Sequence, residues 1–316
     1  MGQTVIEDVL DENATLNTQK LENMDHDEFA NFFEPTLNLF GKPHVKSELP
    51  QEEVVAQSEE DDAKALASKL QGYYFKLLLF AFISEKDEKS VSDIILNIEN
   101  DTDGKRIGKN LQINVKELKL VRDKINPQIL SYLEDKIQNI NQLGKEISPD
   151  KIGIALKKMS RLSVSEVVTP NNVAMELVNN LPDDICASDK FLDIASKTGE
   201  FVNALLQKYG EKIKKNVYSI PTSSVTYECT RKIYKLLGLP VEHIYSDFTS
   251  YDLIDTTKNE EILKELKDMN FDTIVGNPPY QINVGVKKDN YGILIFNKFV
   301  DLSINLNPNY VSLIFP

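Results

Sequence analysis

The chain has 316 residues, of which 41% are hydrophobic and 27% charged, enough for one large domain or two smaller domains with packed cores. Its longest strongly apolar stretch, residues 77–83, is far shorter than the roughly 20 residues that a membrane-spanning helix needs, and the first residues contain no signal-peptide core. Two cysteines without C-x-x-C spacing and three scattered histidines argue against a disulfide framework or a zinc site. We therefore expect a cytoplasmic protein with no metal.

The net charge is confined to one end of the sequence. Residues 1–62 contain 16 acidic residues and 3 lysines, which accounts for the whole formal charge of −13. The rest of the chain is neutral overall. A uniformly acidic protein would repel nucleic acid, whereas a neutral body can still present a local basic face to phosphates. Composition therefore leaves a nucleic-acid partner open without predicting one.

Residues 1–62 are predicted to be an acidic, partly disordered leader. The stretch from 47 to 62 has too few apolar residues to offset the loss of chain entropy on folding. The apolar residues before it are compatible with either a short amphipathic docking helix or a weakly structured tail. These residues are Phe29, Phe32, Phe33, Leu37, Leu39 and Phe40.

Residues 63–150 are predicted to form a helical module. Apolar residues recur there at helical spacing, with lysine and glutamate between them. The periodic positions are Leu70, Tyr73, Tyr74, Leu77 and Leu78, and, after Pro127, Leu130, Leu133, Ile137, Ile140 and Leu143. We interpret these stripes as core contacts of a bundle and not as a ligand-binding surface.

Residues 151–316 alternate short β-type runs with amphipathic helices, which predicts an α/β fold with a doubly wound parallel sheet. The expected strands are 190–194, 216–220, 243–245, 271–276 and 310–315, and the expected helices are 200–209, 225–237, 259–269 and 293–306. Ligands of such sheets bind beyond the carboxyl ends of the strands. Candidate functional residues should therefore follow the strands.

The first predicted strand ends in a candidate cofactor loop, residues 191–201. A carboxylate, Asp193, stands at the strand tip, and a turn with small residues then leads into a helix. Such a turn lets a nucleotide-like ligand approach backbone N–H groups at a helix N-terminus. By itself this signal is weak, because an ordinary turn in which Thr198 caps the helix would have the same sequence pattern.

The fourth predicted strand ends in Asn277-Pro278-Pro279-Tyr280. Two successive prolines fix an extended backbone path, which holds the Asn277 amide and the Pro278 carbonyl at the sheet edge. An exocyclic amine such as adenine N6 is a poor nucleophile, because its lone pair is delocalised into the ring. Two oxygens that accept both amine hydrogens would favour the tetrahedral nitrogen that attacks a methyl group. Tyr280 would stack on the base.

With these motifs, residues 164–316 resemble the class I, S-adenosylmethionine-dependent DNA adenine-N6 methyltransferases of restriction-modification systems, in particular the large fused enzymes. Residues 277–280 match the catalytic N-P-P-Y of that family, and residues 193–201 are similar to its D-P-A-C-G-T-G-x-F loop. Residues 165–170, which end in Thr-Pro, are similar to its G-E-V-F-T-P segment. Residues 246–248 are similar to the segment that carries its acidic residue beside the cofactor's adenine. The four motifs occur in the expected order.

The resemblance implies a Rossmann-like methyltransferase fold, a flipped adenine in double-stranded DNA as substrate, and S-adenosylmethionine as cofactor. The catalytic residues that it implies are Asn277, Pro278, Pro279 and Tyr280. The cofactor-binding residues that it implies are Thr169, Asp193, Ala195, Lys197, Thr198, Gly199, Glu200, Phe201, Asp247 and Phe248.

The sequence departs from the family pattern at the cofactor site. Ile194, Ser196 and Lys197 replace the usual Pro, Cys and first Gly of the loop. Lys197 is hypothesised to pair with the carboxylate of the cofactor, and the alternative is a lysine that faces solvent. The family normally places an acidic residue on the cofactor's ribose after the second strand, but residues 219–223 contain none. Hydroxyl groups or backbone replace it there, or the cofactor binds weakly.

The family fold has two further strands and a target-recognition region after the fifth strand. We therefore expect this chain to be part of a larger restriction-modification polypeptide with further domains or subunits. A site-specific DNA adenine-N6 methyltransferase is the leading hypothesis. Two alternatives stay open, namely N-methylation of a protein glutamine or RNA, and a catalytically degenerate scaffold that docks on DNA.

Overall fold

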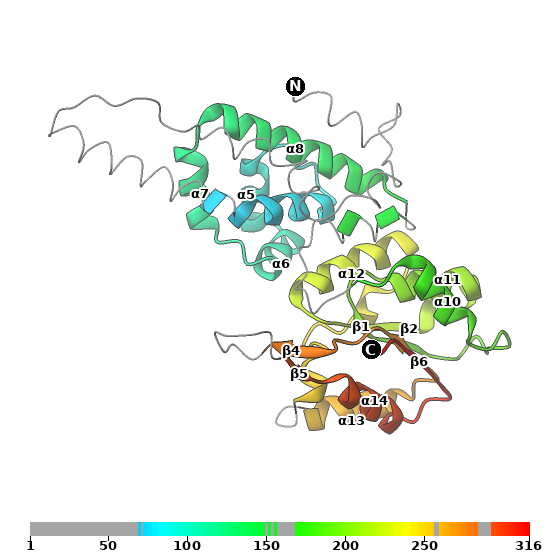
Figure 1. Cartoon of the computed structure of the whole chain (residues 1–316). Coiled ribbons are helices and arrows are strands. Elements are labelled where there is room, and N and C mark those ends of the chain that lie inside the picture. Colours follow the sequence, from blue (N-terminus) through cyan, green and yellow to red (C-terminus); the bar gives the residue numbers. More distant parts are fainter. Residues whose placement is uncertain are drawn as a thin grey trace, which may run out of the picture. The chain divides into compact units, whose positions relative to one another are not determined.

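The computed structural model describes residues 69–70, 72–148, 151–152, 155–156, 168–255, 259–283 and 292–316. The acidic leader and its candidate docking helix lie outside these residues, as do residues 165–167. The described residues up to Ile147 form one compact unit, and those from Ser148 onward form a second one (Figure 1).

The first unit is helical. It contains a helix over residues 72–83, followed by α5 (Val91–Asn100), α6 (Thr102–Asn110), α7 (Val115–Lys124) and α8 (Pro127–Glu146). Polar residues begin these helices, as when the side chain of Ser90 accepts from the N–H of Asp93. The periodic residues of the first helix are all buried, whereas Leu130 and Leu143 in α8 are half-buried and Ile129 is buried instead.

The second unit contains a four-stranded parallel sheet in the order β2-β1-β3-β6. Its strands are β1 (Phe191–Ser196), β2 (Val217–Pro221), β3 (Thr273–Gly276) and β6 (Tyr310–Leu313). Its α-helices are α10 (Asn171–Asn179), α11 (Glu200–Tyr209), α12 (Ser224–Leu237), α13 (Asn259–Met269) and α14 (Phe296–Asn305). Short 3-10 turns, η2 (Gly210–Asn216), η3 (Val241–His243) and η4 (Asp252–Ile254), join some of them.

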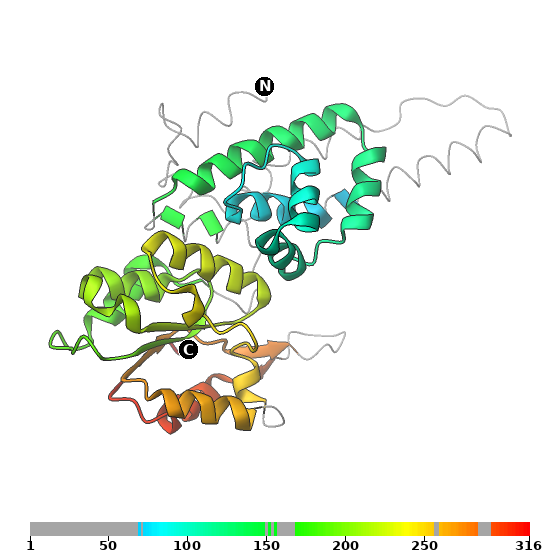
Figure 2. The ribbon, with the colours of Figure 1, turned by 180° about the vertical axis from the view of Figure 1, so that it is seen from behind.

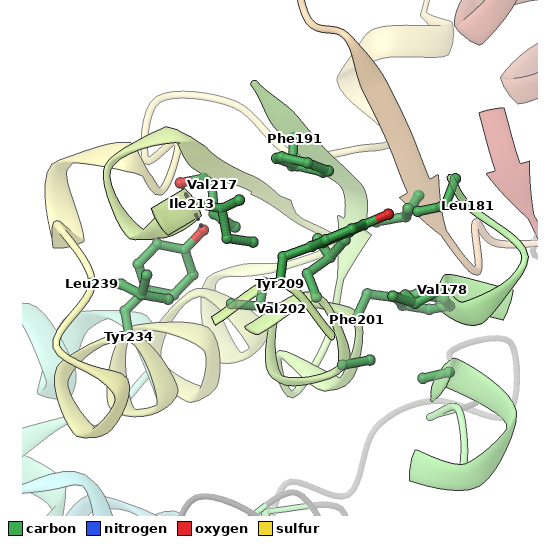
Figure 3. Packing of buried hydrophobic residues seen from close by; sticks show 14 of the residues in the cluster. Val178, Leu181, Phe191, Phe201, Val202, Tyr209, Ile213, Val217, Tyr234 and Leu239 are labelled. Carbon is green, nitrogen blue, oxygen red and sulfur yellow. Dashed lines mark hydrogen bonds between the residues drawn. The ribbon is translucent and has the colours of Figure 1, made fainter. Parts of the chain in front are cut away.

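Helices cover both faces of this sheet, as expected for a doubly wound fold (Figures 1 and 2). On one face, Phe191 of β1 packs with residues of α10, α11 and α12, among them Phe201 and Tyr234 (Figure 3). On the other face, Leu192 of β1 packs with η4, α13 and α14. Successive residues of a strand point to opposite faces, so both faces of β1 are apolar because both are covered.

The sequence prediction of a strand at residues 243–245 is wrong. Ile244 makes only an isolated parallel bridge to Ser219, and η3 occupies the residues before it. The apolar run is short, and Pro240 lies just before η3, so no regular ladder forms beside β2. The chain still passes along this edge of the sheet, where the N–H of Tyr245 donates to the carbonyl of Ser219 at 3.0 Å.

The last predicted helix begins later than expected. Ile293 and Leu294 belong to β5 (Gly292–Leu294), which pairs antiparallel with β4 (Gln281–Asn283). The apolar residues fit a helical period, but pairing with β4 takes these residues into a strand.

Among the described residues, no helix is both long and apolar enough to cross a membrane.

Candidate active site

The candidate site lies where the strand order of the sheet reverses. β2 lies on one side of β1 and β3 on the other, and ligands of open parallel sheets bind in the crevice at such a switch point. A Cβ atom added to Gly276, at the end of β3, would stand 3.4 Å from Oδ1 of Asp193 and 3.3 Å from Cγ2 of Ile194. The absence of a side chain at Gly276 therefore lets the N-P-P-Y segment approach the tip of β1.

The loop after β1 turns through Gly199, which has φ 72° and ψ 22° and stands at the N-cap of α11. A Cβ there would lie 2.8 Å from Cγ2 of Ile233. Thr198 does not cap the helix, so that alternative is wrong. Its N–H and its hydroxyl both donate to Oε2 of Glu200, at 3.0 Å each. The loop is instead stabilised by the first residue of the helix that follows it.

We expect Gly199→Ala to destabilise the second unit more than Gly238→Ala does. Both glycines are left-handed, but Gly238 (φ 66°, ψ 35°) has only the Nζ of Lys214 near an added Cβ, at 3.7 Å. Left-handed strain alone costs about 1–3 kcal/mol, and the contact with Ile233 adds an overpacking cost of similar size. Urea unfolding of both variants measures the difference. Equal losses of unfolding free energy in the two variants would show that Ile233 moves aside at no measurable cost.

Glu200 joins the cofactor loop to the segment that precedes the sheet. Its Oε1 accepts from the N–H of Thr169 at 3.0 Å, while its Oε2 holds Thr198. Thr169 and Glu200 are both buried. The Thr-Pro segment and the loop, 31 residues apart in sequence, are therefore held together by one carboxylate.

Asn277 is held by two contacts from these same segments. The ammonium of Lys197 donates to the main-chain carbonyl of Asn277 at 2.7 Å. The side-chain Nδ2 of Asn277 donates to the hydroxyl of Thr169 at 3.1 Å. Lys197 is only 1% exposed, so the alternative of a solvent-facing lysine is wrong. Its pairing with a cofactor carboxylate stays a prediction.

Asp193 is completely buried beside this group. Its Oδ1 accepts from the N–H of Ala195 at 3.4 Å, and its Oδ2 has no hydrogen-bond partner among the described residues. Burial first, and then the negative charge of Glu200, raise the pKa of Asp193 to about 7, against the opposing hydrogen bonds from Ser196 and the Ala195 N–H and the positive charge of Lys197. A buried acceptor without a partner is costly, and a ligand donor at this oxygen would offset that cost.

The two prolines after Asn277 are buried, and Tyr280 is half-buried. The main-chain carbonyl of Tyr280 accepts from the N–H of Ile295 at 2.9 Å, which fixes the motif to the end of β5. Burial raises the pKa of the Tyr280 hydroxyl. Tyr280 is therefore a partly exposed residue on a main chain that is fixed at its carbonyl.

Asp247 and Phe248 are attached to the same end of the sheet through Ser250. The buried hydroxyl of Ser250 lies 2.9 Å from the carbonyl of Ile194 and 3.1 Å from that of Ile220, at the ends of β1 and β2. Asp247 is exposed, and Phe248 is half-buried. Ser250 was not predicted as a functional residue, because a single serine in a loop carries no signal of its own.

Hydroxyl groups gather after β2, where the resemblance in sequence leads us to expect an acidic residue. Ser223 caps α12 by accepting from the N–H of Thr226 at 3.2 Å, and the hydroxyls of Thr222 and Thr226 lie 3.2 Å apart. The N–H of Thr222 donates to the carbonyl of Ser196, at the end of β1. Glu228 is fully buried within α12.

The structure thus gathers most of the predicted residues at one end of the sheet. Thr169, Lys197, Thr198, Glu200 and Asn277 form a hydrogen-bonded group. Asp193 and Ala195 stand near the end of β1, Gly199 stands at the N-cap of α11, and Pro278, Pro279 and Tyr280 follow Asn277 in the chain. Phe201 is different, because its ring packs in the hydrophobic core (Figure 3). We therefore assign Phe201 to the core.

The strand order and the covered faces define the second unit as a Rossmann-like α/β domain with polar groups at its switch point. Residues 206–316, which include the N-P-P-Y motif, match the model of the Eco57I restriction-modification methylase family.

Among curated proteins, the chain is similar to an "uncharacterized adenine-specific methylase" of Mycoplasma pneumoniae, with 47% identity over 49 residues. The match covers 15% of this chain and 12% of that protein.

Two solved structures are also similar. The cryo-EM structure of a DrdV–DNA complex has a TM-score of 0.45 and 14% identity, and the match covers 90% of this chain and 31% of that one. A type I restriction-modification methyltransferase subunit from Streptococcus thermophilus has a TM-score of 0.42 and 12% identity, over 84% and 74% of the two chains.

Proposed function

We propose that the protein methylates N6 of adenine in double-stranded DNA, with S-adenosylmethionine as the methyl donor, within a restriction-modification system. The observation that carries the proposal is the position of Asn277. It stands at the switch point of the sheet, next to the tip of β1, and contacts both candidate cofactor segments through Lys197 and Thr169.

The residues at the tip of β1 fit the cofactor. Asp193 Oδ2 is a buried acceptor without a partner, and it suits the ammonium group of the cofactor's methionine part. Thr198 and the hydroxyls of Thr222 and Ser223 lie beyond the ends of β1 and β2, where polar parts of a nucleoside would bind. Asp247 and Phe248 would contact its adenine. When bound, S-adenosylmethionine supplies an electrophilic methyl group.

Asn277 and Pro278 would bind the target amine. Because Nδ2 of Asn277 donates to Thr169, its Oδ1 is the side-chain atom that can accept from adenine N6. The carbonyl of Pro278 would accept the second amine hydrogen, and Tyr280 would stack on the base. Only 5% of Asn277 is exposed, so insertion of the base must displace residues that cover this side chain.

Two observations favour this function over the alternatives. The family match and the relative named as an adenine-specific methylase support adenine rather than glutamine as the substrate. The unpartnered Oδ2 of Asp193 supports a ligand-binding site rather than a degenerate scaffold, because an unused site gains nothing from a buried orphan acceptor.

The test is methyl transfer by the full-length gene product from labelled S-adenosylmethionine. Duplex DNA, single-stranded RNA and a glutamine-containing release-factor protein are offered separately, and the product is identified by mass spectrometry. We expect N6-methyladenine in DNA only. Methylation of RNA or protein without DNA would select the second hypothesis. Cofactor binding without transfer to any of the three would contradict the proposed activity.

A further inference from the structure

Lys197 is a buried lysine in a loop position where the resembling family has glycine. Its side chain is 1% exposed, and its ammonium lies 2.7 Å from the main-chain oxygen of Asn277. Burying an ammonium group is costly unless hydrogen bonds replace its water. A lysine at this position is therefore tolerated because it has acceptors there, and Asn277 supplies one of them.

The contact acts on the backbone of the proposed clamp. The carbonyl that Lys197 holds belongs to the peptide between Asn277 and Pro278, so fixing this oxygen fixes that peptide plane. Pro278 has a fixed φ, and the following Pro279 restricts ψ of Pro278 to the extended region, so the Pro278 carbonyl is placed relative to the plane before it. Lys197 thereby restrains the Pro278 carbonyl and the main chain that carries the Asn277 amide.

A second contact restrains the side chain of the same residue. Thr169 accepts from Nδ2 of Asn277 and is itself tied, through its N–H, to Glu200. Glu200 also holds Thr198, the neighbour of Lys197. The main-chain contact and the side-chain contact to Asn277 therefore start from one connected group of residues.

We propose that Lys197 is a positioning residue for methyl transfer, which holds the Asn277–Pro278 peptide in place relative to the cofactor loop. This inference rests on the proposed function. It assigns Lys197 a role different from pairing with the cofactor carboxylate, because the ammonium of Lys197 donates to the main-chain oxygen of Asn277. Loss of the contact should slow transfer without weakening cofactor binding.

The test compares Lys197→Met with wild type in the full-length gene product. Methionine keeps the length of the side chain and removes the ammonium. We expect kcat for DNA methylation to fall 10- to 100-fold. The Kd for S-adenosylmethionine, measured by calorimetry at pH 9, where Asp193 is ionised even without the charge of Lys197, should change less than threefold. Hydrogen exchange in peptides spanning 271–283 should become faster. Unchanged kcat, or a tenfold rise in Kd with unchanged kcat at saturation, would overturn the inference.

Lys208→Met is the matched control. Lys208 also donates to main-chain carbonyls, those of Val178 and Asn179, but it stands at the other end of α11 from Glu200. We expect some loss of stability and an unchanged kcat. If Lys197→Met does not fold, Lys197→Gln is used instead, because it keeps a shorter, neutral donor. We then expect a smaller fall in kcat, again with little change in the Kd for S-adenosylmethionine.

A double-mutant cycle makes the inference sharper. Thr169→Val removes the other restraint on Asn277, and two contacts that hold one residue should give non-additive effects on kcat. Additive losses would count against a shared action on Asn277. If wild type methylates no DNA, the proposed function fails, whereas the exchange measurement still decides whether Lys197 holds the segment.

Discussion

Replacing Asn277 with alanine is expected to lower kcat for DNA adenine methylation by about 100- to 1,000-fold, the range found when one preorganised hydrogen-bonding group is removed from an enzyme's transition-state site. The reason is that Oδ1 of Asn277 is the proposed acceptor for the amine hydrogen, and no other side chain of the N-P-P-Y segment offers an amide oxygen. The Kd for S-adenosylmethionine should change less than threefold. Radiolabel incorporation and calorimetry measure the two quantities.

Asn309→Ala is the control for this variant. Asn309 also donates through its side-chain amide, to Asp272, but it lies just before β6, at the opposite end of the sheet from residue 277. Its removal should leave kcat within about threefold of wild type. Equal methylation by Asn277→Ala and wild type would refute the assigned role of the amide.

Replacing Asp193 with asparagine is expected to weaken binding of S-adenosylmethionine by about 10- to 100-fold at pH 8, the worth of a hydrogen bond to a charged group. The wild-type affinity should also depend on pH. Burial and the charge of Glu200 raise the pKa of Asp193 to about 7, so below this pH the carboxyl is protonated. A cationic ligand group needs the ionised form. Affinity should therefore rise with pH up to about 7 and then level off.

The same carboxyl should make stability depend on pH in the opposite direction. Its pKa in the folded chain lies above the ordinary value of 3.8, so the folded state binds the proton more tightly than the unfolded state. The contribution of Asp193 to the free energy of unfolding is present at low pH and is lost as the pH rises through about 7. Between pH 5 and pH 8, the free energy of unfolding of wild type should fall by roughly 2–3 kcal/mol more than that of Asp193→Asn, at about 1.4 kcal/mol per pKa unit.

Urea unfolding and calorimetry over this pH range test both expectations. Asp272→Asn is the control, because Asp272 accepts from the N–H of Lys190 at the amino end of the sheet. It should bind S-adenosylmethionine as wild type does. An Asp193→Asn variant with the wild-type pH profile of affinity would show that this carboxyl does not bind the cofactor.

Local sequence predicted the regular elements of the second unit well. The helices at 200–209 and 259–269 were predicted with the observed bounds, because each has an uninterrupted apolar period and a clear end. β1 and β3 were recognisable because both of their faces are covered, which requires continuous apolar runs. The run at 243–245 failed because three residues beside β2 do not decide whether a ladder forms.

The candidate site also has features that local sequence predicted and contacts that it could not predict. The N-P-P-Y motif and the carboxylate at the tip of β1 were visible in the sequence, because their chemistry is carried by residues close together in the chain. The role of Ser250 was not visible, since its hydroxyl contacts carbonyls 30 and 56 residues away. The contacts of Lys197 and Thr169 with Asn277 span 80 and 108 residues.

The amino-acid sequence by itself determined the fold class and the four strands of the parallel sheet, and it indicated the residues proposed to bind a nucleobase amine, because these depend on periodicity and local chemistry. Only the tertiary structure decided that the lysine in the loop after β1 is buried on Asn277, that Glu200 joins two segments, and that Asp193 keeps one oxygen without a partner. Such contacts depend on how strands distant in the sequence are packed side by side.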